Sequence, residues 1–154
     1  METVRKIASY ICDRYQRTFG SRIDEMKLHK LLYFTQRECL IQKSEPMFAE
    51  RFQAWKYGPV MVQIRKLYKD DMLHVRCSKS FEDQFRDVFD KVFEQYATKD
   101  SWSLSYLTHG EYSWQQARKG VPAGEGCDKL IDTEDIKIDA ERIRIRRLLL
   151  KKKN

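Results

Sequence analysis

The sequence contains 154 residues, of which 42% are hydrophobic and 34% charged, and its formal net charge at pH 7 is +7. These values are typical of one soluble domain with a buried core, and they exclude a membrane span because no apolar run is as long as a bilayer is thick. The N-terminal residues lack the apolar core of a signal peptide, so we expect a cytoplasmic protein.

Helical periodicity begins almost at the N-terminus. Apolar residues recur at three- and four-residue steps from Val4 to Tyr15, which predicts an amphipathic helix that Gly20 ends. Asp24 can cap a second helix that contains Leu28–Cys39. Two aromatic residues of this second helix fall off its apolar stripe, so we expect it to be covered on more than one side.

The middle of the chain predicts short strands and a turn. Phe48–Tyr57 mixes apolar and polar residues, which favours a short strand or one arm of a small hairpin. We expect Gly58 and Pro59 to form a sharp turn that starts a short helix over Val60–Tyr68. Glycine permits unusual backbone angles and proline suits the first position of a helix. Met72–Cys77 is a second candidate strand.

Further helices are predicted in the second half of the chain. We expect helices to begin at Ser80, Ser101 and Ser113, and Thr133 to cap the last one, because hydroxyl side chains accept hydrogen bonds from first-turn N–H groups. The helix at Ser80 has the clearest apolar stripe, which must face the core or a partner. Gly120–Gly126 is a loop without the pattern of a phosphate-binding loop.

The positive charge is concentrated at the C-terminus. Residues 137–154 contain eight basic and two acidic residues, so they hold +6 of the net charge. Isoleucine spacing there fits both a strand and a helix, and we favour a basic amphipathic helix with a frayed lysine end. Such a helix can neutralise phosphates, whereas solubility, disorder or an acidic protein partner are the more common explanations. The candidate contacts to a nucleic acid or acidic partner are Arg142, Arg144, Arg146, Arg147, Lys151 and Lys152.

No residue pattern predicts catalysis, a metal or a cofactor. The four cysteines and three histidines include no C-x-x-C pair and no i, i+4 histidine pair, so we expect free thiols rather than a metal site. No G-x-S-x-G elbow is present. His109, next to Gly110, is the one histidine in a suggestive setting. It either closes a helix end or has a specific role, and an enzyme would need it to meet a carboxylate or thiol in a pocket.

Three sequence blocks occur in order along residues 3–136. The first is Lys27–Gln36, which fits K-L-x-K-L-L-Y-x-x-Q; the second is Glu45–Phe48 followed by Ala54–Val60; the third is Leu104–His109 with Trp114 and Ala117, which fits L-x-x-L-T-H and a tryptophan. Ile131–Ile136 is similar to the terminal segment that usually follows them. Together these blocks resemble the Panacea domain family, the SocA-like antitoxins of toxin–antitoxin pairs.

This resemblance implies a mainly α (α+β) fold, with a compact helical domain and a small β-hairpin or short strands. We expect a Panacea-like antitoxin domain over residues 1–136 and a basic C-terminal helix or tail over residues 137–154. The resemblance implies no catalysis. It implies an antitoxin of a bacterial or phage pair that neutralises a cognate protein toxin by direct binding.

Alternative functions stay open. The first alternative is an adaptor that delivers a target to a bacterial protease, or a phage-encoded regulatory interaction protein. The second is a nucleic-acid-binding regulator that acts through its basic tail. A toxin-binding surface needs exposed aromatic anchors with polar groups around them. The motif residues that we expect at this surface are Lys30, Tyr33, Trp55, Tyr57, Gly58, Pro59 and His109. The opposing interpretation is that these residues form the core and that the partner surface lies elsewhere.

Overall fold

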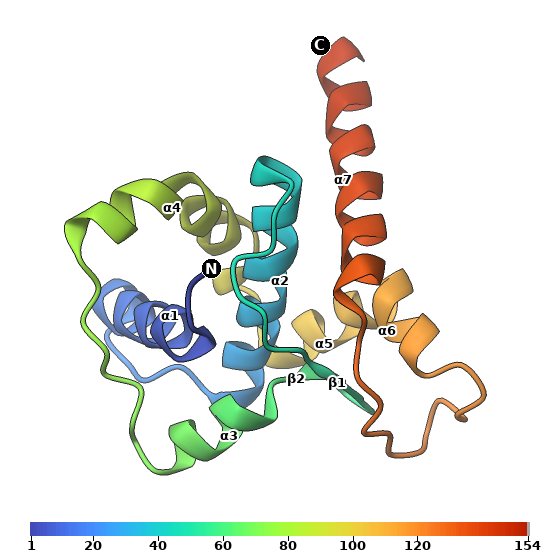
Figure 1. Ribbon diagram of the computed structural model, residues 1–154, viewed down its shortest axis with the longest axis horizontal. Helices are drawn as coiled ribbons and strands as arrows, with labels where there is room; N and C mark the ends of the chain where they lie inside the picture. Colours follow the sequence, from blue (N-terminus) through green and yellow to red (C-terminus); the bar gives the residue numbers. More distant parts are fainter. Residues whose placement is uncertain (154) are drawn as a thin grey trace.

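A computed structural model describes residues 1–153 and shows a mainly helical protein (Figure 1). Its elements in chain order are α1 (Val4–Phe19), α2 (Glu25–Lys43), β1 (Gln53–Trp55), β2 (Gly58–Val60), α3 (Val62–Lys69), α4 (Lys79–Val92), the π-helical segment η1 (Phe93–Ala97), α5 (Ser101–His109), α6 (Tyr112–Ala117) and α7 (Thr133–Lys153). The two strands form one antiparallel sheet. The predicted fold class, mainly α with a small hairpin, is confirmed.

Helix α2 is the central element of the fold. Every residue from Lys27 to Ile41 is buried, because α1 and α4 lie to one side of the helix and α7 to the other, while α5 and β2 also contact it. A helix that is covered on all sides needs no single apolar stripe. The expectation that this helix is covered on more than one side is therefore confirmed.

Helix ends follow local capping chemistry, with shifts of one or two residues. Asp24 caps α2 as predicted and accepts a hydrogen bond from the Lys27 N–H at 2.8 Å, and Gly20 ends α1 in the left-handed conformation. The predicted caps Ser80 and Ser101 are wrong, although α5 does begin at Ser101. Ser78 caps α4 and Asp100 caps α5, because each of these neighbouring polar side chains reaches the N–H three residues further on. For α7, the Asp132 carboxylate accepts from the Glu134 N–H, so Thr133 is the first helical residue rather than the cap.

The hairpin corrects the predicted role of the Gly-Pro pair. Gly58 and Pro59 do not start a helix, because they belong to β2 and lie opposite Trp55 and Ala54 in the register of the sheet. The chain reverses one step earlier, at residues 56–57, and α3 begins only at Val62. Proline is tolerated here because β2 pairs with β1 on one side only, so that a residue without an N–H can face its unpaired edge.

Residues 72–77 do not form the predicted second strand. Within the part of the chain that the structure describes, the sheet contains only β1 and β2, so this segment has no strand to pair with. Its Leu73 is nevertheless buried. Leu73 alone of the alternating pair contacts the core, since Val75 is exposed, so the alternation here does not mark a β-ladder.

The apolar stripe of α4 faces the core. Its buried residues are Phe81, Phe85, Val88, Phe89 and Val92. At its end the wider π-helical turn of η1 places the Tyr96 ring parallel to that of Phe34 on α2, with 4.1 Å between ring centroids and 8° between planes. Of the two predicted alternatives for this stripe, core or partner, the core is confirmed.

The C-terminal segment is one continuous helix, α7, and not a strand. It passes through the predicted boundary at residues 136–137 without a break, and its first turns pack on the domain through Ile136 and Ala140. Its last turns extend beyond the other helices (Figure 1) and expose Leu148–Leu150. No helix within residues 1–153 is both long and apolar enough to cross a membrane.

Candidate partner-binding site

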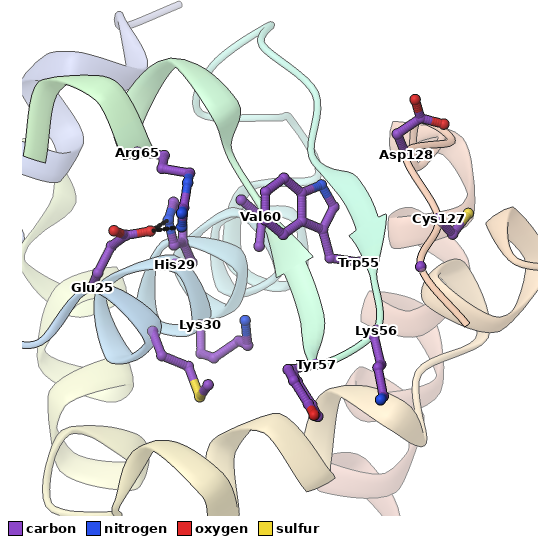
Figure 2. Close-up of a pocket in the computed structure, with 12 residues that line it drawn as sticks. Glu25, His29, Lys30, Trp55, Lys56, Tyr57, Val60, Arg65, Cys127 and Asp128 are labelled. Atoms are coloured by element: carbon purple, nitrogen blue, oxygen red, sulfur yellow. Dashed lines mark hydrogen bonds and ion pairs between the residues drawn. The ribbon is translucent and has the colours of Figure 1, made fainter. Parts of the chain in front are cut away.

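A pocket of about 790 Å³ opens beside the first turns of α2 (Figure 2). Its walls are formed by Glu25, Met26, His29 and Lys30 of α2, Trp55, Lys56, Tyr57 and Val60 of the hairpin and its turn, Arg65 of α3, and Gly126, Cys127 and Asp128 of the loop before α7. Three of the predicted site residues, Lys30, Trp55 and Tyr57, therefore line one pocket. They come from two of the three sequence blocks.

The aromatic wall of the pocket is held by its backbone. The carbonyl of Trp55 accepts a hydrogen bond from Trp114 Nε1 at 2.9 Å, and the carbonyl of Tyr57 accepts one from Ser105 Oγ at 2.6 Å. The Trp55 ring lies 5.4 Å from the Arg65 guanidinium, which covers its face. The Tyr57 side chain remains 46% exposed. The backbone carbonyls of Trp55 and Tyr57 are thus fixed by hydrogen bonds, and the side chains of both residues line the pocket.

Gly58 and Pro59 are buried in β2, where they lie directly against the Lys30 side chain. Lys30 Nζ donates a hydrogen bond to the Pro59 carbonyl at 3.1 Å. Gly58 has a φ of +112°, which residues with a Cβ rarely adopt. A Cβ at that position would lie 2.7 Å from Lys30 Cε and closer still to Thr108 Oγ1. Glycine is therefore required where the hairpin crosses Lys30 and α5.

Charges on the α2 side of the pocket are mostly paired. Glu25 accepts from Arg65 at 2.7 Å and contacts His29 Nε2 at 3.1 Å (Figure 2). His29 Nδ1 accepts from the Met61 N–H at 3.2 Å, so the ring proton lies on Nε2 and points to Glu25. Burial lowers the pKa of His29, and the hydrogen bond from His29 lowers the pKa of Glu25. Lys30 has no such partner, and burial lowers its pKa to about 7.

His109 lies behind the pocket wall and not in the pocket. Its ring stacks on Trp114 with 4.4 Å between centroids and 15° between planes. The helix end is closed through its backbone, since the His109 carbonyl accepts from Gln115 Nε2 at 2.8 Å. Burial lowers the pKa of the imidazole, which makes no ion pair within residues 1–153. The residue therefore acts as a packing partner of Trp114 in this structure.

Tyr33 is fully buried, and its side chain reaches α6 and α7 rather than the pocket. Its hydroxyl lies 2.7 Å from Ser113 Oγ, 3.3 Å from Glu111 and 3.4 Å from Asp139. Arg37 forms an ion pair with the same Glu111. Tyr33 is therefore a core residue and not part of an exposed surface, because none of its area is exposed.

This buried network also explains how α6 begins. The predicted start at Ser113 lies one residue inside the helix, which begins at Tyr112. The Asp139 carboxylate of α7 accepts from the N–H groups of Tyr112 and Ser113 at 2.8 and 2.9 Å. The cap of α6 thus comes from another helix, and it joins α6 and α7 to α2 through Tyr33.

An exposed aromatic patch lies next to the pocket, and sequence reasoning missed most of it. Trp102 and Tyr106 of α5 are 60% and 78% exposed, and Leu107 is 41% exposed. The Trp102 ring meets Tyr57 edge to face at 5.1 Å. We call Tyr57, Trp102, Tyr106 and Leu107 the aromatic patch. The i, i+4 spacing of Trp102 and Tyr106, away from the buried Leu104, is the signal that could have identified it.

The basic residues of α7 are only partly available to a partner. Arg147 forms two hydrogen bonds of 2.8 Å with the buried Glu38 of α2, and Arg144 pairs with Glu141 on its own helix. Arg142 lies over the Tyr112 ring at 5.1 Å. The exposed side chains of Arg146, Lys151 and Lys152 form no ion pair within the described residues. Two of the six predicted contacts are thus already paired with carboxylates.

The pocket combines apolar walls with one buried amine. Within residues 1–153, no group of three or more histidine, cysteine or acidic side chains is arranged to hold a metal. All four cysteines are free thiols, and burial raises the pKa of Cys39 to about 11. Aromatic and aliphatic walls with one buried amine suit an apolar group that carries a polar end.

Comparison with known proteins agrees with the sequence blocks. Residues 28–115 match the family described as "Antitoxin SocA-like, Panacea domain". The chain is 24% identical over 149 aligned residues to Antitoxin SocA of Caulobacter vibrioides (strain NA1000 / CB15N), and the alignment covers 82% of this chain and 79% of that protein. No solved structure matches the chain. Because the matched region spans more than half of the chain, including α2, the hairpin and α5, this protein belongs to the family of SocA-like antitoxins with a Panacea domain.

Proposed function

We propose that this protein is an antitoxin that neutralises a cognate protein toxin by direct binding, without catalysis. We further propose that the aromatic patch and the rim of the adjoining pocket form the toxin-binding surface. The observation that carries the proposal is the exposure of Tyr57, Trp102 and Tyr106 side by side on a rigid scaffold. Membership of an antitoxin family supports the role, and the patch supports the mode of binding.

The patch has the composition of an interface centre. Tryptophan and tyrosine dominate binding energy at protein interfaces, because each covers a large area and also has a polar atom to satisfy. α5, which holds two of these rings, is anchored at its start, where Asp100 accepts from the Ser103 N–H at 2.9 Å. At its middle, Ser105 donates a hydrogen bond to the carbonyl of Tyr57 in the hairpin turn. A preorganised surface of this kind loses little side-chain entropy on binding.

Co-expression with the gene encoded beside it tests the proposal. The neighbouring product should arrest growth alone and should be neutralised by this protein. Trp102→Ala and Tyr106→Ala should each weaken the complex about 30-fold, corresponding to about 2 kcal/mol. Phe19→Ala is the matched control, since Phe19 is an aromatic residue 40% exposed at the end of α1. It should bind like the wild type.

Stoichiometry separates binding from catalysis. A binding antitoxin must be present in at least equimolar amount to restore growth or toxin activity in vitro. Neutralisation by a small fraction of an equivalent would contradict the proposal. A requirement for a bacterial protease would instead indicate an adaptor. Wild-type affinity in both patch variants would place the toxin-binding surface elsewhere.

A further inference from the structure

Lys30 occupies an unusual position for a lysine. It lies at the floor of the pocket with only 1% of its area exposed, and the Pro59 carbonyl is its hydrogen-bond acceptor in the described chain. An ammonium group has three donors and is costly to bury without an opposite charge. Within residues 1–153 Lys30 forms no ion pair, because the nearest acid of the pocket, Glu25, is engaged by Arg65 and His29.

The surrounding charges do not supply the missing partner. On α2 and its cap, Glu25 and Asp24 favour the charged amine from a distance, and Asp24 is occupied by the Lys27 N–H and by Ser101. Of the other charged groups, His29 on α2 and His109 on α5 disfavour the charged amine, Lys56 and Arg65 of the pocket wall are basic, and Asp128 of the loop before α7 is acidic but forms no ion pair with Lys30. Within residues 1–153, no carboxylate therefore lies within ion-pair distance of Lys30.

The fold accommodates this amine at a cost. Gly58 must remain without a side chain because Lys30 Cε and Thr108 fill the space beside it. A methionine or leucine at position 30 would occupy similar volume with no desolvation penalty. A charged group that is costly to bury and is left without an opposite charge beside an open pocket is typical of a binding site rather than of a core.

We propose that the pocket receives a segment of the toxin that places a carboxylate on Lys30 and a bulky apolar side chain against Trp55, Met26 and Val60. This inference rests on the proposed function. The carboxylate is favoured by charge complementarity, and the apolar neighbour by the character of the walls. A protein segment is favoured because Tyr57 belongs to both the pocket and the aromatic patch, so that one partner covers them together.

Binding in this way should take up a proton. Because burial lowers the pKa of Lys30 to about 7, the free protein holds most of this amine neutral at pH 8. A carboxylate in contact with the amine restores its charge and raises its pKa. The groups that surround Lys30 respond less, because Glu25 and Arg65 are already paired, and because His29 is held neutral by its burial and by the Met61 N–H that donates to its Nδ1.

The test is calorimetry of the toxin complex at pH 8 in two buffers that differ in ionisation enthalpy. The wild type should take up close to one proton per complex. Lys30→Met should bind at least tenfold more weakly and take up no proton. Lys69→Met, which removes an exposed lysine at the end of α3 outside the pocket and the aromatic patch, should keep the uptake and stay within about threefold of wild-type affinity. Circular dichroism and thermal unfolding show whether Lys30→Met is folded.

A second measurement needs no substitution and no toxin. The protein is titrated with 4-phenylbutyrate and with its neutral amide, 4-phenylbutyramide, while the indole N–H signal of Trp55 is followed by NMR. The acid should bind at least tenfold more tightly, because a charge-assisted contact exists only for the carboxylate. Equal affinity would overturn the inference whether or not a toxin complex forms.

The outcomes separate this inference from the proposed function. A toxin complex that is unaffected by Lys30→Met overturns the inference and leaves direct neutralisation standing. If 4-phenylbutyrate binds more tightly than its amide but Lys30→Met does not weaken the toxin complex, the pocket binds a free small acid. That result would also overturn the inference. Failure of the wild type to bind the neighbouring protein would contradict the proposed function itself.

Discussion

Gly58 is the position where one added methyl group should do most damage. The change Gly58→Ala introduces a Cβ at a φ of +112°, which costs about 1–3 kcal/mol in backbone strain. The new atom would also lie 2.7 Å from Lys30 Cε and closer to Thr108 Oγ1, and overpacking of this kind costs about 1–3 kcal/mol more. We therefore expect the free energy of unfolding to fall by about 3 kcal/mol.

Gly20→Ala is the matched control for this change. Gly20 also has a positive φ, of +77°, but a Cβ there would meet no atom within 4 Å. It should cost only the strain, about 1 kcal/mol. In urea, with an m-value of about 2 kcal/mol/M, the midpoints should fall by about 1.5 M for Gly58→Ala and about 0.5 M for Gly20→Ala.

A double-mutant cycle locates the cause of the difference. In a Thr108→Ala background, where the hydroxyl closest to the new Cβ is absent, Gly58→Ala should cost measurably less than in the wild type. Equal losses for Gly58→Ala and Gly20→Ala would refute the steric argument. So would a loss at Gly58 that does not change when Thr108 is truncated.

Three further predictions concern buried polar groups. Tyr33→Phe should lower the unfolding free energy by about 1–3 kcal/mol, because three oxygen atoms lose a buried partner; an unchanged urea midpoint would contradict this. Arg147→Ala should cost about 2 kcal/mol because Glu38, only 1% exposed, loses its cation, whereas Arg144→Ala, which breaks an exposed ion pair, should leave the urea midpoint essentially unchanged. Between pH 7 and about 8.5 the unfolded chain binds a proton that folded Lys30 does not, so wild-type stability should rise with pH by up to about 1.4 kcal/mol per unit, and Lys30→Met should lack this rise. Above that range burial of Cys12 and Cys39, which raises the pKa of each thiol to about 11, opposes the rise in both proteins.

The pocket and the aromatic patch give the family motifs two different roles. Lys30, Gly58 and Pro59 together create a buried amine at the floor of a pocket, and Trp55 and Tyr57 wall it. Other motif residues stabilise the scaffold. Most of the exposed aromatic area comes from Trp102, outside the three sequence blocks, and Tyr106, which lies in the third block but was not among the residues expected at the partner surface.

The sequence by itself determined the helices and several of their ends. Apolar periodicity predicted α1, α2 and α4, and Asp24 was correctly identified as a cap. These signals are reliable because they are local: a capping carboxylate and the N–H it accepts from lie three residues apart. The three blocks likewise identified the family, which residues 28–115 match.

Only the tertiary structure decided where the motif residues point. The Gly-Pro pair suits a helix start as well as a strand, and contacts with Lys30 and Thr108, distant in sequence, place it in β2. Asp139 caps α6 from 26 residues away, and Tyr57 meets Trp102 across two elements. Spacing along a chain cannot report such contacts, because they depend on how helices pack around α2 and on which side of each helix remains uncovered.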